Sequence, residues 1–265
     1  MIIDFHNHVF PDKIAEKTMR FLRDEIDDMY GAVHDGTASG LLKSMDAFGI
    51  DISIILPIVT RQSQTKSINE WAASICSDRL ISFGSIYPHT DDYKRDIDFV
   101  SGLGLRGLKL HAEYQSFNVD DEFMLKIYDY ALNKGLIILH HGGLDEAYPD
   151  TARSTPRMFA RVAEEMKGAV IIAAHLGGYK LWDDVEKYLV GTDIYFDTSM
   201  GFEFFTEDQF LRIVKKHGTD KILFASDSPW SNAKTEREHL LSMPLSDDEK
   251  AAILSGNAKR ILNIA

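Results

Sequence analysis

The sequence of 265 residues contains a single cysteine, Cys76, so no disulfide can form within one chain. Proteins without disulfides are typical of a reducing compartment. The sequence also lacks an apolar run of about 18 residues, the length that a transmembrane helix needs. It shows no basic segment followed by an apolar signal region near Met1. From these absences we expect a cytoplasmic protein that makes no contact with a membrane.

Positive charge is also scarce. The chain has 29 Lys and Arg against 41 Asp and Glu, which gives a formal net charge of −12. Surfaces that bind nucleic acid or anionic membranes need a basic face, so we expect neither class of partner. A small anionic ligand stays compatible with this charge, because a few arginines in a pocket can outweigh the field of the whole protein. The partner that we expect is a small-molecule substrate.

The remaining composition is that of an ordinary globular protein, with 45% hydrophobic and 26% charged residues. A chain of this length buries roughly three quarters of its unfolded surface, so its core needs no disulfide or structural metal. No internal repeat, low-complexity segment or interdomain linker interrupts the sequence. We therefore expect one domain that spans residues 1–265.

Eight strand-like segments alternate with helical patterns. We expect strands at Ile2–His8, Ile52–Ile58, Ile81–Tyr87, Gly104–His111, Leu136–His141, Val170–His175, Asp193–Ser199 and Lys221–Asp227. Apolar residues at spacings of three and four predict helices at Ala38–Phe48, Ser67–Ser77, Tyr93–Leu103, Asp121–Lys134, Arg157–Met166, Lys180–Tyr188, Glu207–His217 and Asp247–Leu262. Eight βα units predict an α/β fold, a (β/α)8 TIM barrel. A doubly wound open sheet is the alternative, but no glycine-rich phosphate loop follows the first strand.

Two connections are longer than a barrel requires. Residues 9–37 (Val9–Thr37) follow the first strand, and residues 142–155 (Gly142–Thr155) follow the fifth. In a barrel, both would lie over the C-terminal mouth, where segments that cover a substrate are found. We call them the first and second mouth loops.

Polar residues gather where the expected strands end. His6 and His8 project to one face of the first strand, because alternate side chains of a strand share a face. The same alternation puts Asp4 on their face but deeper, as a structural acceptor. An isolated pair of this kind is more often solvated than metal-bound. Later strands, however, also end in histidine or aspartate, and imidazoles with a carboxylate suit Zn²⁺, with Fe²⁺, Mn²⁺ and Co²⁺ as alternatives.

Four segments resemble the amidohydrolase superfamily, and the similarity extends from residue 2 to residue 262. They are Asp4-Phe5-His6-Asn7-His8, His140-His141-Gly142, Ala174-His175-Leu176-Gly177-Gly178 and Ala225-Ser226-Asp227-Ser228-Pro229. The nearest resemblance is to the amidohydrolase-related branch that includes aminocarboxymuconate-semialdehyde decarboxylase. It implies a metal held by His6, His8, His140 and Asp227. It further implies that His175 activates water or polarises the substrate, and that Asp227 can also shuttle a proton.

Within the strand-five motif, the resemblance favours His140 over its neighbour, because the family's ligand precedes an x-Gly pair. Since adjacent residues of a strand face opposite ways, His141 is then expected to face the helices or to cap the strand.

The role of Lys109 has two alternatives. Binuclear relatives such as phosphotriesterase bridge two metals with a carbamylated lysine on the fourth strand, which would allow a second metal here. The decarboxylase-like branch uses one metal, and we favour one divalent metal, Zn²⁺, with Lys109 holding a substrate carboxylate. Other candidate substrate contacts are His111, Arg61 and Arg153, for which a barrel-lining or solvated surface role is the alternative. Relatives are often dimers, so we also consider a homodimer.

Three functions follow from these residues. The leading hypothesis is a hydrolase that acts on a small carboxylated molecule through metal-activated water. The alternative is a non-oxidative decarboxylase of an aromatic or muconate-type acid. The third is a barrel that binds a metal or ligand without turnover.

Overall fold

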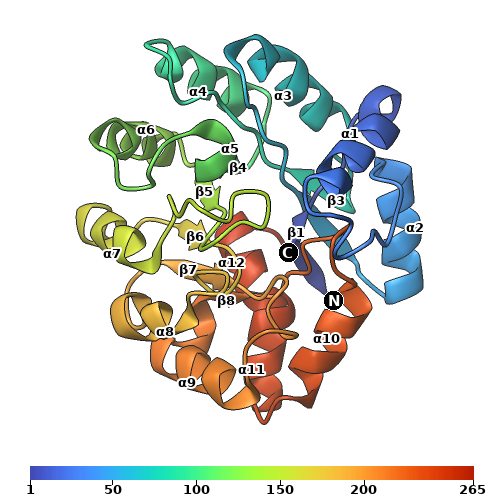
Figure 1. Cartoon of the computed structure of the whole chain (residues 1–265), viewed down its shortest axis with the longest axis vertical. Coiled ribbons are helices and arrows are strands. Elements are labelled where there is room, and N and C mark those ends of the chain that lie inside the picture. The colour runs from blue at the N-terminus through green and yellow to red at the C-terminus, as the bar shows by residue number, and fades with distance from the viewer.

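The computed structural model describes all 265 residues, whose helices and strands alternate around a ring (Figure 1). The strands are β1 (Ile3–Asn7), β2 (Ile52–Ile55), β3 (Leu80–Ser82), β4 (Gly107–Leu110), β5 (Ile137–His140), β6 (Ile171–Ala173), β7 (Tyr195–Asp197) and β8 (Ile222–Leu223). The helices are α1 (Asp12–Asp24), α2 (Ala38–Phe48), α3 (Thr65–Ser74), α4 (Tyr93–Gly102), α5 (Ala112–Gln115), α6 (Glu122–Asn133), α7 (Pro156–Glu165), α8 (Trp182–Asp184), α9 (Glu207–His217), α10 (Ala233–Ser242), α11 (Asp247–Ala251) and α12 (Asn257–Leu262).

All strand pairs are parallel, and they form one sheet of β1 to β3 and another of β4 to β8. Isolated parallel bridges join the two sheets at both seams, Gly84 with Leu108 and Asn7 with Ser228. At the second seam, the amide of Phe5 also donates to the carbonyl of Phe224 at 2.9 Å. The strands therefore follow one another around a ring with the helices outside, and the expected TIM barrel is confirmed.

The observed strands are shorter than the expected ones, mainly at their C-terminal ends. β6 stops at Ala173 and β8 at Leu223, whereas the sequence predicts strands that continue to His175 and Asp227. The difference arises because the backbone turns out of the sheet there: His175 and Asp227 have φ values of 59° and 68°. His175 and Asp227 therefore lie on the rim of the barrel, outside the hydrogen-bonded part of the strands.

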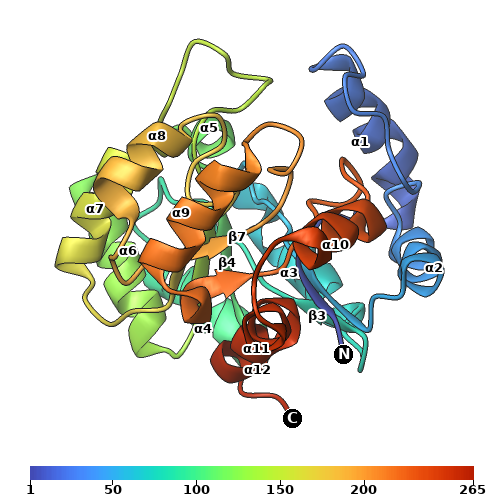
Figure 2. The same cartoon turned by 90° about the horizontal axis from the view of Figure 1, so that it is seen from below.

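The structure contains three helices that the sequence pattern does not predict: α1, the short α5 and α10. The expected last helix is divided into α11 and α12 by a π-helical segment, Ala252–Gly256, and a second π segment, Val185–Leu189, continues α8. The first mouth loop thus contains a helix, and Figure 2 shows α1 standing apart from the barrel at the end opposite the two termini. No helix has the length and the apolar composition that crossing a membrane requires.

The barrel interior is filled by a compact apolar cluster that includes Phe5, Ile54, Phe83, Leu139 and Leu223. A larger cluster of 46 residues packs between the strands and the helices. Close packing requires glycine at position 107, because a Cβ there would lie 2.6 Å from the ring of Phe83 and 2.4 Å from the Ile137 carbonyl oxygen. The filled interior makes the strand ends the floor of the site.

β1 contains a register shift that decides which side chains reach this floor. Asp4 pairs with Ser53, but Asn7 pairs with Ile55, so β1 holds one extra residue in between. Such a bulge redirects the side chains that follow it. His6 and His8 therefore line the cavity, while Asp4 points to β8 and accepts the amide and hydroxyl of Ser226. The expectation that Asp4 shares their face is wrong for this reason.

Candidate active site

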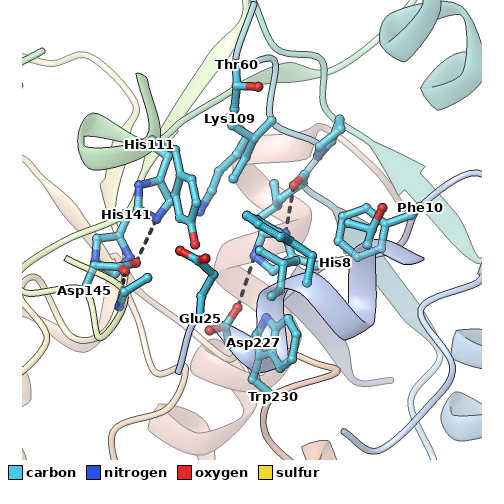
Figure 3. Close-up of a pocket in the computed structure, with 18 of the residues that line it drawn as sticks. His8, Phe10, Glu25, Thr60, Lys109, His111, His141, Asp145, Asp227 and Trp230 are labelled. Carbon is cyan, nitrogen blue, oxygen red and sulfur yellow. Dashed lines mark hydrogen bonds and ion pairs between the residues drawn. The ribbon is translucent and has the colours of Figure 1, made fainter. Parts of the chain in front are cut away.

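A cavity of about 650 Å³ opens at the C-terminal ends of the strands. Its floor carries His6, His8, Lys109, His141 and Asp227, and both mouth loops contribute to its walls (Figure 3). The walls include the aromatic side chains of Phe10, Tyr30, Trp71, Tyr114, Tyr148, Tyr179 and Trp230. A concave, mostly apolar cavity of this size with convergent polar groups fits a small-molecule ligand.

His6, His8 and Asp227 form the first of two polar clusters at this floor, the β1/β8 cluster. Nδ1 of His6 lies 2.9 Å from a carboxylate oxygen of Asp197, and Nδ1 of His8 lies 3.0 Å from the Leu56 carbonyl. Both partners only accept hydrogen bonds, so both Nδ1 atoms must be the protonated ones. The two Nε2 atoms are then lone-pair acceptors.

The Nε2 atoms of His6 and His8 and Oδ1 of Asp227 face one another, and hydrogen-bond donors are too few to pair with all three. The two Nε2 atoms lie 3.1 Å apart, and Oδ1 of Asp227 lies 3.3 Å and 3.2 Å from them. Lys109 Nζ approaches Nε2 of His6 at 3.1 Å, while Oδ1 of Asp227 has no hydrogen-bond donor. Converging lone pairs of this kind are matched by a cation. Two neutral imidazoles and a carboxylate fit a divalent metal.

The protonation states agree with this fit. Burial, reinforced by the charge of Lys109, lowers the pKa of His6 to about 3, and burial also lowers the pKa of His8. Burial would raise the pKa of Asp227, but His6 and His8 outweigh it and the net shift is downward. Metal ligands must be deprotonated, and these groups already are at neutral pH.

Asp197, at the end of β7, supports both His6 and His175. Besides His6, its carboxylate accepts the amides of His175 at 2.9 Å and Ser199 at 3.1 Å. It is completely buried, and its hydrogen bonds and neighbouring histidines lower its pKa despite that burial. The sequence interpretation missed this residue. Its signal was the same as for the other site residues, an acidic side chain near the end of an expected strand.

His111, His141 and Asp145 form the second cluster, the β4/β5 cluster, which also includes Glu113. His111 places Nε2 3.3 Å from Asp145 and Nδ1 3.4 Å from Glu113. Burial would lower the pKa of His111, but these two carboxylates raise it overall. His111 is thus buried between two carboxylates, which favour its protonated form, and its ring stacks on that of His141 with the ring centroids 4.5 Å apart.

The choice of His140 over His141 is wrong in its geometry. In β5, His140 pairs with Leu110 and faces the helices, where its ring is surrounded by Phe117, Tyr128 and Phe159. It is fully buried, and neither ring nitrogen has a partner. His141 follows Leu139 on the interior face and lines the cavity. The family motif therefore indicated the wrong member of the pair, and alternation from His140 then placed His141 on the wrong face.

His175 joins the two clusters. Its Nδ1 lies 3.1 Å from the carbonyl of Ser199, and its Nε2 lies 3.1 Å from Nδ1 of His141. The positive φ of His175, like that of Asp227, is unfavourable for a residue with a Cβ and is typical of functional sites. Backbone hydrogen bonds hold both turns, including that from the amide of Asp227 to the His6 carbonyl at 2.9 Å.

The expected substrate contacts divide into two groups. Lys109, His111 and Arg61 line the cavity, and Arg61 is exposed there without an ion-pair partner. Arg153 does not line it, and its amide donates to Glu113 from the second mouth loop. Of the two alternatives for Arg153, a substrate contact and a solvated surface role, the structure therefore favours the second. Burial lowers the pKa of Lys109 to about 8.

Comparisons with known proteins show the family and the fold. The sequence profile of a family described as amidohydrolase matches residues 3–264. No curated protein sequence matches the chain. Similar solved structures include a 5-carboxyvanillate decarboxylase from Novosphingobium aromaticivorans with bound manganese and 3-methoxy-4-hydroxy-5-nitrobenzoic acid. It has a TM-score of 0.77 and 18% identity over 100% of this chain and 97% of that one.

Two further structures are similar over nearly their whole length. A 2,6-dihydroxybenzoate decarboxylase from Rhizobium has a TM-score of 0.68 and 16% identity, covering 99% of this chain and 98% of that chain. An uncharacterised TIM-barrel protein from Bordetella bronchiseptica has a TM-score of 0.76 and 18% identity, with the same two coverages. The reactions named among these neighbours are decarboxylations. This finding overturns the leading expectation of a hydrolase.

Proposed function

The chain belongs to the amidohydrolase family, and within it we propose that this protein is a divalent-metal-dependent decarboxylase of a small aromatic or conjugated carboxylic acid. The observation that carries the proposal is the cavity itself. Two neutral imidazoles and a carboxylate that together suit a divalent metal, those of His6, His8 and Asp227, lie at the floor of the pocket. Aromatic side chains line its walls, as does Arg61, which has no ion-pair partner. The similarity to two decarboxylases of aromatic acids supports the same reaction class.

The reaction replaces a carbon–carbon bond with a carbon–hydrogen bond. The electron pair of the broken bond stays on the ring or alkene carbon, a proton joins that carbon, and carbon dioxide leaves. The site must therefore orient the carboxylate, supply one proton and keep bulk water away from the carbon.

We assign the metal to His6, His8 and Asp227, with His141 as the histidine that reaches the cavity from β5. When bound, the divalent cation would withdraw electron density from the substrate oxygens that it holds. Manganese, which is bound in the structure of one neighbour, and zinc both suit this donor set. A second metal with a carbamylated Lys109 is the alternative, and the metal count with and without bicarbonate distinguishes the two.

We assign to His175 the delivery of the proton to the carbon that loses the carboxylate. Its Nδ1 is held by Ser199, so Nε2 is the atom that takes up and delivers the proton on the cavity side. Asp227, whose pKa is lowered, stays anionic and is suited to hold charge rather than to donate a proton. Arg61 supplies a cation at the cavity wall for the substrate carboxylate, and Lys109 a second one at the floor.

The test is carbon dioxide release from a panel of hydroxylated benzoates and muconate-type acids by the manganese- or zinc-loaded protein. In D₂O, the product should carry one deuterium at the carbon that lost the carboxylate. Asp227→Asn should abolish release. Arg61→Ala should raise KM, while Arg153→Ala, the matched control outside the cavity, should leave it unchanged. Metal-loaded protein that releases no carbon dioxide from the panel but hydrolyses esters or lactones would contradict the proposal.

A further inference from the structure

A second cavity of about 260 Å³ lies beside the main one. The two cavities share Tyr30, Met200 and Trp230 as lining residues. We call this space the side cavity. Nothing in the proposed decarboxylation uses it.

Glu236, on α10, lines the side cavity and is only 3% exposed. One of its carboxyl oxygens accepts the hydroxyl of Ser231 at 2.6 Å, whereas Oε2 has no partner. An unpaired buried carboxyl oxygen is costly and calls for an explanation. Burial, followed by the negative charges of Glu203, Asp4 and Asp227, raises the pKa of Glu236 to about 8, because no cation stands beside it; a cation bound there would favour its ionised form.

The charges and rings around Glu236 favour a positively charged ligand. Glu203 also lines the side cavity, but no lysine, arginine or histidine does. The aromatic side chains of Tyr30, Phe204 and Trp230 complete the walls. Lys180 lies over the ring of Phe204 at 5.3 Å, but it pairs with Glu146 and is not a lining residue. Carboxylates together with aromatic faces are the groups that recognise an ammonium ion.

We propose that the side cavity binds the protonated amino group of a small ligand, with Glu236 as its counter-ion and the aromatic walls around it. A neutral hydrogen-bond acceptor facing Glu236 is the competing occupant, and it would leave Glu203 and the three rings without a role. The inference stands apart from the proposed reaction, because binding is measured without turnover.

The test is calorimetric titration of the metal-loaded protein with n-butylammonium and with 1-butanol, which has the same shape and no charge. Butylammonium should bind about tenfold or more tightly than 1-butanol, as expected for a hydrogen bond to a charged group. Glu236→Gln should abolish this difference. Glu238→Gln is the matched control on the same helix, because Glu238 is exposed and faces Lys234. Equal binding of the two probes, or unchanged binding in Glu236→Gln, would overturn the proposal.

A second variant and a second pair of probes complete the design. If Glu236→Gln does not fold, Glu203→Gln carries the test, because Glu203 is the other carboxylate that lines the cavity, and unaltered binding would again count against the proposal. Titration with 4-(aminomethyl)benzoate and 4-methylbenzoate identifies the source of the amino group. A Glu236-dependent preference for the amino compound indicates a substrate that spans both cavities. A Glu236-dependent site for butylammonium alone indicates a separate amine.

Discussion

The β1/β8 and β4/β5 clusters contain the same residue types and differ in how their hydrogen bonds are matched. In the β1/β8 cluster, Asp197 and the Leu56 carbonyl occupy the Nδ1 atoms, so lone pairs converge on one point. In the β4/β5 cluster, a carboxylate oxygen lies 3.3 or 3.4 Å from each ring nitrogen of His111. The first cluster therefore turns several lone pairs toward one point with only Lys109 nearby, whereas carboxylates flank both ring nitrogens of His111 in the second.

This comparison shows that histidine and aspartate content does not by itself identify a metal centre. The tautomer of each imidazole decides it, and the tautomer is set by the partner of the other ring nitrogen. We therefore expect metal removal to affect the β1/β8 cluster, and pH to affect the β4/β5 cluster.

The largest effect is expected from a β1/β8 ligand. His8→Ala should abolish bound metal in elemental analysis and lower turnover by more than about 100-fold, since even residues that only support ligands contribute 10- to 100-fold. His111→Ala, the counterpart in the β4/β5 cluster, should keep its metal. Loss of metal in His111→Ala with retention in His8→Ala would reverse the comparison.

An Asp197 variant tests whether metal binding depends on the proton that Asp197 keeps on Nδ1 of His6. Asp197→Asn can donate to His6 through its amide nitrogen, so Nδ1 no longer needs to hold the proton. We expect metal affinity to fall by about 10- to 100-fold in a metal-buffer titration. Asp193→Asn, at the exposed start of the same strand region, is the control and should bind metal as the wild type does. Unchanged affinity in Asp197→Asn would remove the role that we assign to this carboxylate.

His111→Gln tests the β4/β5 cluster, in which carboxylates flank the imidazole. It leaves the buried Glu113 and the half-buried Asp145 without a cation between them, so we expect a loss of about 3 kcal/mol in unfolding free energy, or about 6–12 °C in Tm. Because the folded-state pKa of His111 is raised, its contribution is complete below the unfolded value of about 6.5 and is lost as pH rises through the folded value. The Tm deficit measured by calorimetry should therefore shrink between pH 6 and pH 9. A deficit that grows with pH would show that His111 is neutral.

The smallest effect is expected at His140. His140→Leu removes two unpartnered buried nitrogens from an aromatic shell, so stability should change by less than about 1 kcal/mol or rise. Metal content should stay at the wild-type level. His141→Leu, one residue away, should lower turnover because its ring lines the cavity. A His140→Leu protein without metal would restore the original assignment.

Much of the fold could be predicted, because alternating apolar strands and helices are local patterns. All eight strands and the TIM barrel were anticipated, as was the gathering of His6, His8, His175 and Asp227 at the mouth. The helix α1 was missed, although its apolar face is visible at helical spacing. Asp197 was missed because nothing distinguishes it locally from other aspartates near strand ends.

The sequence by itself determined the architecture and the residue types at the strand ends, since both depend on short-range periodicity. Only the tertiary structure decided which of two adjacent histidines faces the cavity, and that a bulge in β1 turns Asp4 away. It also decided which imidazoles are matched by carboxylates and which are left with converging lone pairs. These outcomes depend on contacts between residues far apart in the chain, such as His6 with Asp197 and Asp4 with Ser226, and local pattern contains no information about such pairs.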